Sequence, residues 1–299
     1  GIRAIIVMPK TTPDIKVQAV KRLGGEVVLH GDSFDVANKY AIQRAAEDGM
    51  SFIPPYDDEL VMAGQGTIGN EILRQWRDVD YVFVAVGGGG LIAGVAAYLG
   101  DVAPHVKVIP VEYDESACLK AAFEAGERVV LPQVGLFADG TAVAQIGEKP
   151  FEVIQLQKSD NSGPLVEREV VLVNTDEICA AIKDTYDECR SIVEPSGAMA
   201  LAGIKKYVET HELIGQNIVS IVCGANMNFD RLRYIAERTE LGERKEAIFA
   251  VTIPEKKGSF LNFCRALQGR NITEFNYRAS DASAAQVFVG ISLKGGEKE

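Results

Sequence analysis

The feature of the sequence best suited to chemistry is a run of four glycines directly after an apolar, strand-like segment. The run Val82 to Gly94 reads VFVAVGGGGLIAG. Glycine leaves the backbone N–H groups uncovered, and a helix that starts at this point adds the positive end of its dipole. The pattern predicts a phosphate-binding loop, and its other interpretation is a tight turn between a strand and a helix.

The same segment also fits a dinucleotide-binding motif. Gly88, Gly90 and Ala93 satisfy G-x-G-x-x-A, and Glu112 lies about 20 residues further on, as an NAD(P)-binding fold requires. An NAD(P)-dependent oxidoreductase is therefore the alternative hypothesis. The position of the motif disfavours it, because this motif usually opens its domain at the first strand, and strand-like segments come earlier here.

Two further runs place polar groups where α/β sheets bind ligands. Ile221 to Asn228 (IVCGANMN) puts Cys223 at the end of an apolar strand, and Glu194 to Ala198 (EPSGA) sets a carboxylate beside a predicted helix start. Their simpler interpretations are a buried structural thiol and an ordinary helix N-terminus. The acidic run Asp57 to Glu59 is interpreted as a solvated turn rather than a cation site.

Short apolar runs alternate with amphipathic segments, which predicts a parallel sheet with helices on both faces. The expected strands are 4–8, 26–30, 81–86, 106–111, 170–173 and 218–222, and the expected helices are 14–23, 34–48, 62–76, 91–99, 176–186, 198–210 and 229–238. The polar run 158–164 is expected to be a surface loop. From residue 247 the order becomes strand, helix, strand, strand, over 247–254, 259–267, 272–277 and 286–293, which is the first part of a split βαββαβ unit.

Composition excludes several functional classes. The chain has 31 basic and 42 acidic residues, a net charge of −11, which argues against binding to nucleic acid. Apolar stretches are too short or too interrupted to predict a membrane span. The five cysteines form no zinc-like pattern and are typical of a reducing compartment.

Three runs, in order, carry a resemblance to a known family. They are GGGGL at Gly87 to Leu91, EPSGA at Glu194 to Ala198, and CGANMNFDRLR at Cys223 to Arg233. Together with AGQGT at Ala63, GLFADG ending at Gly140, and VTIPEKKGSF at Val251, they resemble biosynthetic threonine deaminase (threonine ammonia-lyase). The resemblance covers nearly the whole chain.

The resemblance implies a fold-type II pyridoxal-phosphate (PLP) enzyme, similar to the tryptophan synthase β subunit, followed by a partial ACT-like regulatory domain. The domains it implies are the remainder of the smaller lobe at 1–57, the larger lobe with the phosphate loop at 58–241, and the partial regulatory domain at 247–299. The implied activity is that of a lyase, the deamination of L-threonine to 2-oxobutanoate and ammonia in isoleucine biosynthesis. The cofactor-binding residues that it implies are Gly87, Gly88, Gly89, Gly90, Leu91, Gly140, Glu194 and Cys223.

One part of the family pattern is missing from the sequence. The Schiff-base lysine of the family lies in a Ser-Phe-Lys segment, and an Asn from a Gly-Asn-His segment supports the cofactor hydroxyl, but neither segment occurs here. We expect both upstream of Gly1, in a longer natural chain, so no catalytic residue is assigned and the chain alone is predicted to be inactive. Lys10 and Lys183 are the substitutes considered, and a non-catalytic product that pairs with an intact subunit is the third hypothesis.

The resemblance also implies partners and regulation. The substrate is L-threonine, with L-serine as an alternative, and isoleucine and valine are the allosteric effectors of a complete regulatory domain. The intact relatives are homo-oligomers, with a tetramer expected. The expected location is the cytoplasm, or an organelle if a leader has been removed.

Overall fold

A computed structural model of the chain describes residues 2–12, 14–156, 165–243, 245–267, 269–279 and 283–293. The loop expected at 158–164 lies outside the described residues. The described chain divides into two compact units, residues 1–173 with 191–229 and residues 174–190 with 230–299. The domain boundaries expected from the sequence stay a prediction.

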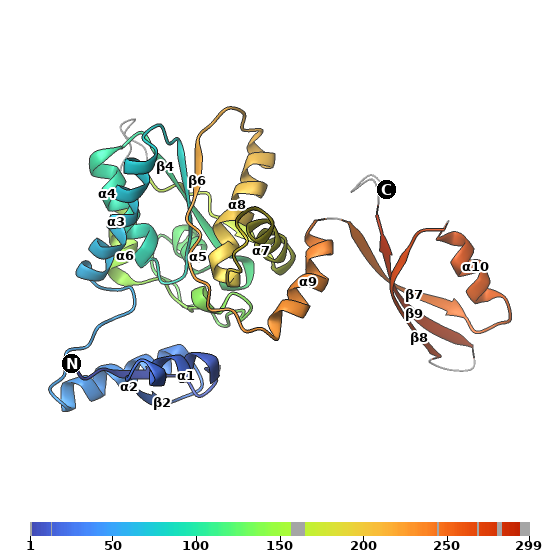
Figure 1. The fold of residues 1–299 in the computed structure, drawn as a ribbon, viewed down its shortest axis with the longest axis horizontal. Helices are drawn as coiled ribbons and strands as arrows, with labels where there is room; N and C mark the ends of the chain where they lie inside the picture. Colours follow the sequence, from blue (N-terminus) through green and yellow to red (C-terminus); the bar gives the residue numbers. More distant parts are fainter. Residues whose placement is uncertain are drawn as a thin grey trace. The chain divides into compact units, whose positions relative to one another are not determined.

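Unit 1 contains two parallel sheets and the helices that pack on them (Figure 1). The strands are β1 (Ile5–Met8), β2 (Glu26–Leu29), β3 (Tyr81–Ala85), β4 (Lys107–Tyr113), β5 (Val171–Val173) and β6 (Ile218–Ser220). The α-helices are α1 (Asp14–Arg22), α2 (Phe34–Glu47), α3 (Glu59–Gln75), α4 (Gly90–Val102), α5 (Cys118–Ala125), α6 (Glu148–Leu156) and α8 (Pro195–His211), with short 3-10 turns η1 (Asp114–Ser116) and η2 (Asp139–Thr141).

The larger sheet of unit 1 has the strand order β5-β4-β3-β6, with all pairs parallel. Helices α3, α4 and α6 lie on one side of it and α8 on the other (Figure 1). Because both faces are covered, β3 and β4 are buried along almost their whole length, which explains why their sequences are mainly apolar. β1 and β2 form a separate two-stranded parallel sheet.

Two helices of unit 1, α5 and α6, are absent from the sequence-based expectation. The first turn of each is capped by a carboxylate that is not its immediate neighbour in sequence. Glu112 on β4 accepts from Leu119 N at 2.7 Å and Lys120 N at 2.9 Å. Asp57 accepts from the backbone N–H groups of Glu148 and Lys149, each at 3.0 Å.

The acidic run 57–59 is therefore structural. Asp57 caps α6, and Asp58 is the N-cap of α3, where its carboxylate accepts from Leu60 N and Val61 N. Glu59 forms an ion pair with Lys149. The expected solvated turn is replaced by two helix caps, which tie the start of α3 to the start of α6.

Unit 2 contains α7 (Thr175–Cys189), α9 (Arg231–Gly242), and an antiparallel sheet of β7 (Glu246–Pro254), β8 (Ile272–Ala279) and β9 (Ala284–Ser292) with helix α10 (Ser259–Ala266). The strand order is β7-β9-β8. Alternate residues of β9, namely Ala285, Val287, Val289 and Ile291, are buried in a core with Ile253. The expected order of strand, helix, strand, strand is confirmed.

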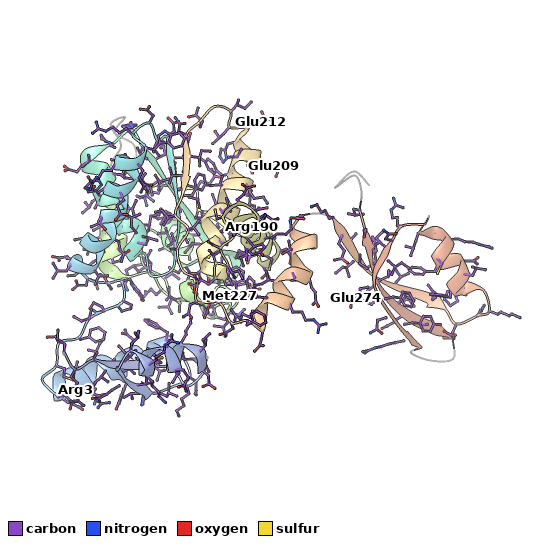
Figure 2. The ribbon with its side chains drawn as sticks, viewed as in Figure 1. Arg3, Arg190, Glu209, Glu212, Met227 and Glu274 are labelled. Atoms are coloured by element: carbon purple, nitrogen blue, oxygen red, sulfur yellow. The ribbon has the colours of Figure 1, made fainter. Side chains whose placement is uncertain are left out.

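Two helices end at non-glycine residues with left-handed backbone. Arg190 closes α7 with φ 54° and Glu212 closes α8 with φ 49°, and both are labelled in Figure 2. Within the described residues, no helix is both long and apolar enough to cross a membrane.

Candidate active site

The glycine loop, Gly87 to Leu91, joins the end of β3 to the first turn of α4. Gly89 is the N-cap of α4 and has a φ of 87°, a left-handed conformation that favours glycine. A Cβ at Gly88 would lie 2.4 Å from the ring of Tyr56, and a Cβ at Gly87 would lie 2.8 Å from Thr141 Cα. Both of these positions therefore require glycine for close packing.

The backbone N–H groups of the glycine loop have no acceptor in the part of the chain that the structure describes. Among the described residues, none of the five consecutive N–H groups from Gly87 to Leu91 donates a hydrogen bond to the protein, although these residues are buried or half-buried. An unpaired buried N–H costs roughly 1–3 kcal/mol and is rare. Five together, at the N-terminus of α4, form a site suited to an anion such as a phosphate.

The carbonyl groups of the loop, in contrast, are bonded within the protein. Gly87 O accepts from the Cys118 thiol at 3.3 Å, and Gly88 O accepts from Gly147 N at 3.0 Å. Val86 N donates to Val111 O at 2.8 Å. The loop is thus attached on its carbonyl side, while its N–H groups are left for a ligand.

Glu194 and Cys223 meet beside Gly140 at the N-terminus of α8. Glu194 Oε2 accepts from Asn226 N at 2.9 Å, and Glu194 N donates to Gly224 O at 3.2 Å. A Cβ at Gly140 would lie 2.9 Å from Glu194 Oε1, and a Cβ at Gly197 would lie 2.1 Å from Cys223 O. The structure therefore brings three sequence-predicted residues, Gly140, Glu194 and Cys223, into one cluster.

Thr141 and Ser196 connect this cluster to the glycine loop. Their hydroxyl oxygens lie 3.4 Å apart, and Thr141 Oγ1 also donates to Ala138 O at 3.0 Å. Thr141 packs against Gly87 through its backbone, and Ser196 Oγ lies against Gly140. Neither hydroxyl was assigned a role from the sequence, although Ser196 lies within the EPSGA run and Thr141 directly follows Gly140.

The Cys223 thiol is half-buried and keeps its proton at neutral pH. Burial raises the pKa of Cys223, and the charge of Glu194 raises it further. The side chain is thus a neutral, weak hydrogen-bond donor.

The residues of the dinucleotide alternative do not form a ribose-binding site. Glu112 is fully buried, and both of its carboxylate oxygens accept N–H groups of α5. Burial raises the pKa of Glu112 to about 7, against the opposing effect of these two bonds. A carboxylate held in this way is not available to accept ribose hydroxyls, so the nicotinamide hypothesis is dropped.

Neither substitute lysine has the environment of a nucleophile. Lys183 Nζ lies 2.6 Å from Glu243 and 3.2 Å from Asp187, and these hydrogen bonds raise its pKa, which keeps it protonated. Lys10 is exposed just after β1. A lysine that acts as a nucleophile needs a lowered pKa instead.

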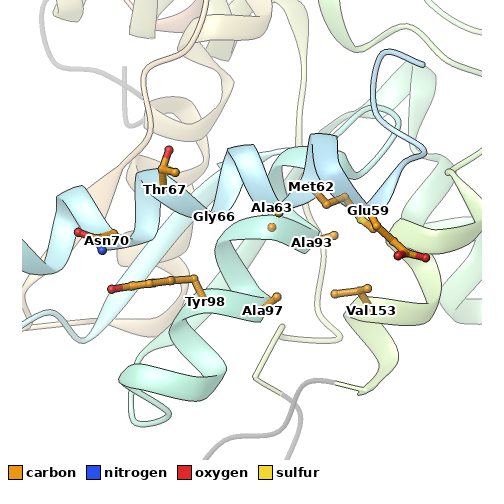
Figure 3. A pocket seen from close by; sticks show the side chains of 11 residues that line it. Glu59, Met62, Ala63, Gly66, Thr67, Asn70, Ala93, Ala97, Tyr98 and Val153 are labelled. Atoms are coloured by element: carbon orange, nitrogen blue, oxygen red, sulfur yellow. The ribbon is translucent and has the colours of Figure 1, made fainter. Parts of the chain in front are cut away.

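A cavity of about 450 Å³ lies between α3 and α4, apart from these residues (Figure 3). Its lining is mainly small and apolar, with Glu59, Thr67 and Asn70 as polar members. Ala93, from the dinucleotide alternative, is among its lining residues, whereas none of the cofactor-binding residues implied by the resemblance lines it. The chemistry is therefore assigned to the glycine loop and not to this cavity.

Comparison with known proteins shows the family of the chain. Residues 1–224 match the family of pyridoxal-phosphate dependent enzymes, and residues 237–299 match the C-terminal regulatory domain of threonine dehydratase. The chain therefore belongs to the pyridoxal-phosphate dependent enzymes. The expected fold class, a parallel α/β fold followed by a regulatory domain, is confirmed, as is the expected cofactor of the family.

The similar proteins include a threonine dehydratase, a threonine deaminase and a serine racemase. The chain is 52% identical, over all of its 299 residues, to the L-threonine dehydratase biosynthetic IlvA of Escherichia coli (strain K12), and spans 56% of that protein. It is 48% identical to the processed form of threonine deaminase isoform 2 from Solanum lycopersicum, with a TM-score of 0.74 over 80% of this chain and 63% of that one. It is 28% identical to maize serine racemase, with a TM-score of 0.68 over 80% of this chain and 71% of that one.

Proposed function

We propose that this chain carries the phosphate-binding part of an enzyme that removes water and then ammonia from L-threonine, giving 2-oxobutanoate for isoleucine biosynthesis. The observation that carries the proposal is the row of five N–H groups that have no acceptor among the described residues. Thr141 and Ser196 connect this row to the cluster of Gly140, Glu194 and Cys223. The names of the relatives support the choice of substrate. The chain spans about half the length of the curated relatives it matches.

In this proposal, the N–H groups of the glycine loop bind the cofactor phosphate, and the dipole of α4 adds to its affinity. The bound cofactor supplies an electron sink for the negative charge that develops at the substrate Cα. The neutral thiol of Cys223 would hold the pyridine nitrogen of the cofactor and leave it weakly protonated, which suits elimination over transamination. Glu194 would hold the cofactor ring, and Gly140 leaves room for its carboxylate.

The finer expectations from the sequence remain part of the proposal. They are L-serine as an alternative substrate, isoleucine and valine as effectors, a homotetramer, and a cytoplasmic location or an organelle. The match of residues 237–299 to a regulatory domain supports the search for effectors.

The test is release of 2-oxobutanoate from L-threonine, measured with pyridoxal phosphate added. The purified chain is assayed alone and mixed with a polypeptide that bears the Ser-Phe-Lys segment of the family. We expect turnover only in the mixture. Turnover by the chain alone would show that one of its own lysines suffices, and a mixture that binds the cofactor without turnover would favour the non-catalytic hypothesis.

A matched pair of variants makes the assay specific for the glycine loop. A Cβ at Gly90 would lie 2.9 Å from Tyr56 O, whereas a Cβ at Gly64, on α3, has nothing within 4 Å. Gly90→Ala is expected to abolish cofactor binding and turnover in the mixture, and Gly64→Ala to preserve both. Equal behaviour of the two variants would contradict the assigned phosphate site.

A further inference from the structure

A chain of buried contacts joins Glu112 to the glycine loop. Glu112, on β4, binds the first-turn N–H groups of Leu119 and Lys120. Cys118, the first residue of the same helix, donates its thiol proton to Gly87 O at 3.3 Å. Glu112 and Cys118 are both fully buried, and the proposed mechanism uses neither of them.

The Gly87 carbonyl fixes the direction of a neighbouring donor. In a planar trans peptide, the C=O of one residue and the N–H of the next point in opposite directions. The bond from Cys118 to Gly87 O therefore directs Gly88 N–H away from α5, and the bond from Gly147 N to Gly88 O likewise fixes the direction of Gly89 N–H. The two N–H groups directed in this way belong to the row that has no protein acceptor.

The position of Cys118 depends in turn on Glu112. Helix α5 is eight residues long, and its N-cap residue Ala117 has no side-chain group to cap it. The only side-chain acceptor for its first-turn N–H groups within the described residues is the Glu112 carboxylate. Without that carboxylate, buried N–H groups at the start of α5 would lack acceptors, which favours fraying of the turn that carries Cys118.

The thiol of Cys118 is suited to this donor role. Burial raises its pKa, and the charge of Glu112 and a hydrogen bond between the two side chains raise it further. The proton therefore stays on sulfur across the working pH range. A thiolate at this position would repel Gly87 O and lose the bond.

We propose that Cys118 and Glu112 are positioning residues for cofactor binding: together they hold the Gly87 carbonyl so that Gly88 N–H points at the phosphate. The inference rests on the proposed function for the identity of the ligand. It requires that the effect of these residues be specific for the phosphate group. A merely structural role would weaken the binding of every ligand alike.

The experiment uses the whole chain and two ligands, pyridoxal phosphate and pyridoxal, whose dissociation constants are measured by calorimetric titration. Loss of one oriented donor corresponds to roughly a fivefold change in affinity. We expect Cys118→Ala to raise the dissociation constant of pyridoxal phosphate roughly fivefold and to leave that of pyridoxal unchanged. Cys118→Ser, which keeps a donor, is expected to restore most of the lost affinity.

Cys179 provides a matched control. It is a fully buried cysteine of α7 whose side chain makes no hydrogen bond given for the described residues, and its backbone oxygen accepts from Thr239 Oγ1. Cys179→Ala removes the same volume from a core and is expected to leave both dissociation constants unchanged. An equal loss of pyridoxal phosphate affinity in Cys179→Ala and Cys118→Ala would overturn the proposal.

A second variant covers the case in which Cys118→Ala does not fold. Glu112→Gln keeps the shape and one acceptor oxygen, and is expected to weaken pyridoxal phosphate alone. A parallel loss for both ligands, or no loss in any variant, would sink the inference. If the unaltered chain does not bind pyridoxal phosphate more tightly than pyridoxal, the proposed function is contradicted. If the unaltered chain has this preference and the variants have the same dissociation constants as the unaltered chain, only the present inference is contradicted.

Discussion

At the scale of single residues, Glu112 makes a measurable contribution to the pH dependence of stability. Its pKa is raised from 4.5 to about 7 by burial, so the folded state holds the proton over a range in which the unfolded chain has released it. The contribution of Glu112 to stability is therefore complete below pH 4.5, declines as the pH rises to about 7, and is constant above that.

Glu112→Gln removes this titration, so the difference in unfolding free energy between the unaltered chain and the variant isolates it. We expect the free energy of unfolding of the unaltered chain, relative to that of the variant, to fall by about 3 kcal/mol between about pH 4.5 and about pH 7.5. Urea denaturation at several pH values measures it. A difference that is constant with pH, or that moves in the opposite direction, would show that the Glu112 pKa is not raised.

Gly140 gives a second test at this scale. An added Cβ would meet Glu194 Oε1 and Ser196 Oγ, each at 2.9 Å, and would displace both side chains. Such overpacking costs about 1–3 kcal/mol, so Gly140→Ala is expected to weaken pyridoxal phosphate binding about tenfold. Fluorescence titration measures this, and an unchanged affinity would remove Gly140 from the site.

At the scale of elements, the close crossing of α3 and α4 depends on glycine. A Cβ at Gly94 of α4 would lie 2.1 Å from Met62 O and 2.9 Å from Gly66 N, both on α3. Figure 3 shows Ala63, Gly66 and Thr67 of α3 opposite Ala93 and Ala97 of α4. The helices must therefore separate if position 94 gains a side chain.

We expect Gly94→Ala to lower the free energy of unfolding by about 3 kcal/mol. Gly64→Ala, on an open face of α3, is expected to raise it by up to about 1 kcal/mol, because alanine favours the helix. Thermal denaturation of both variants checks the pair. Stabilisation by both substitutions would mean that the helices do not cross at Gly94.

The same scale shows which parts of the fold the sequence could predict. The segments that became β3, β4 and α4 were predicted, because strands buried on both faces are mainly apolar and the glycines mark the turn between β3 and α4. Helices α5 and α6 were missed, because their capping carboxylates, Glu112 and Asp57, lie outside the local window that a capping motif occupies. Helix ends satisfied by tertiary contacts leave no signal in the neighbouring sequence.

The residues of the candidate site also fall into those that the sequence could predict and those that it could not. The phosphate-binding loop was predicted from the glycines between a strand and a helix. Glu194 and Cys223 were assigned through the resemblance to threonine deaminase, and their roles stay predictions. Thr141 and Cys118 were not, because their roles depend on contacts to Ser196 and to Gly87 O. Residues that act through another residue are recognised only once the chain is folded.

At the scale of the whole molecule, the two units have separate cores. Val82 of β3 lies in the core of unit 1, and Val289 of β9 lies in that of unit 2, and neither is exposed to solvent. Each core contains its own sheet, so each unit is expected to unfold cooperatively. We therefore expect two transitions in differential scanning calorimetry.

Val82→Ala and Val289→Ala form a matched pair for assigning the transitions. Each removes the same two methyl groups from a buried strand, at a cost of about 2 kcal/mol. Val82→Ala is expected to lower only the transition that pyridoxal phosphate raises, since the glycine loop belongs to unit 1 and ligand binding stabilises the state that binds it. Val289→Ala is expected to lower only the other. If both variants lowered the temperature of one shared transition, the two units would unfold as one cooperative event. Ligand binding at the glycine loop would then also stabilise the β7-β9-β8 sheet of unit 2.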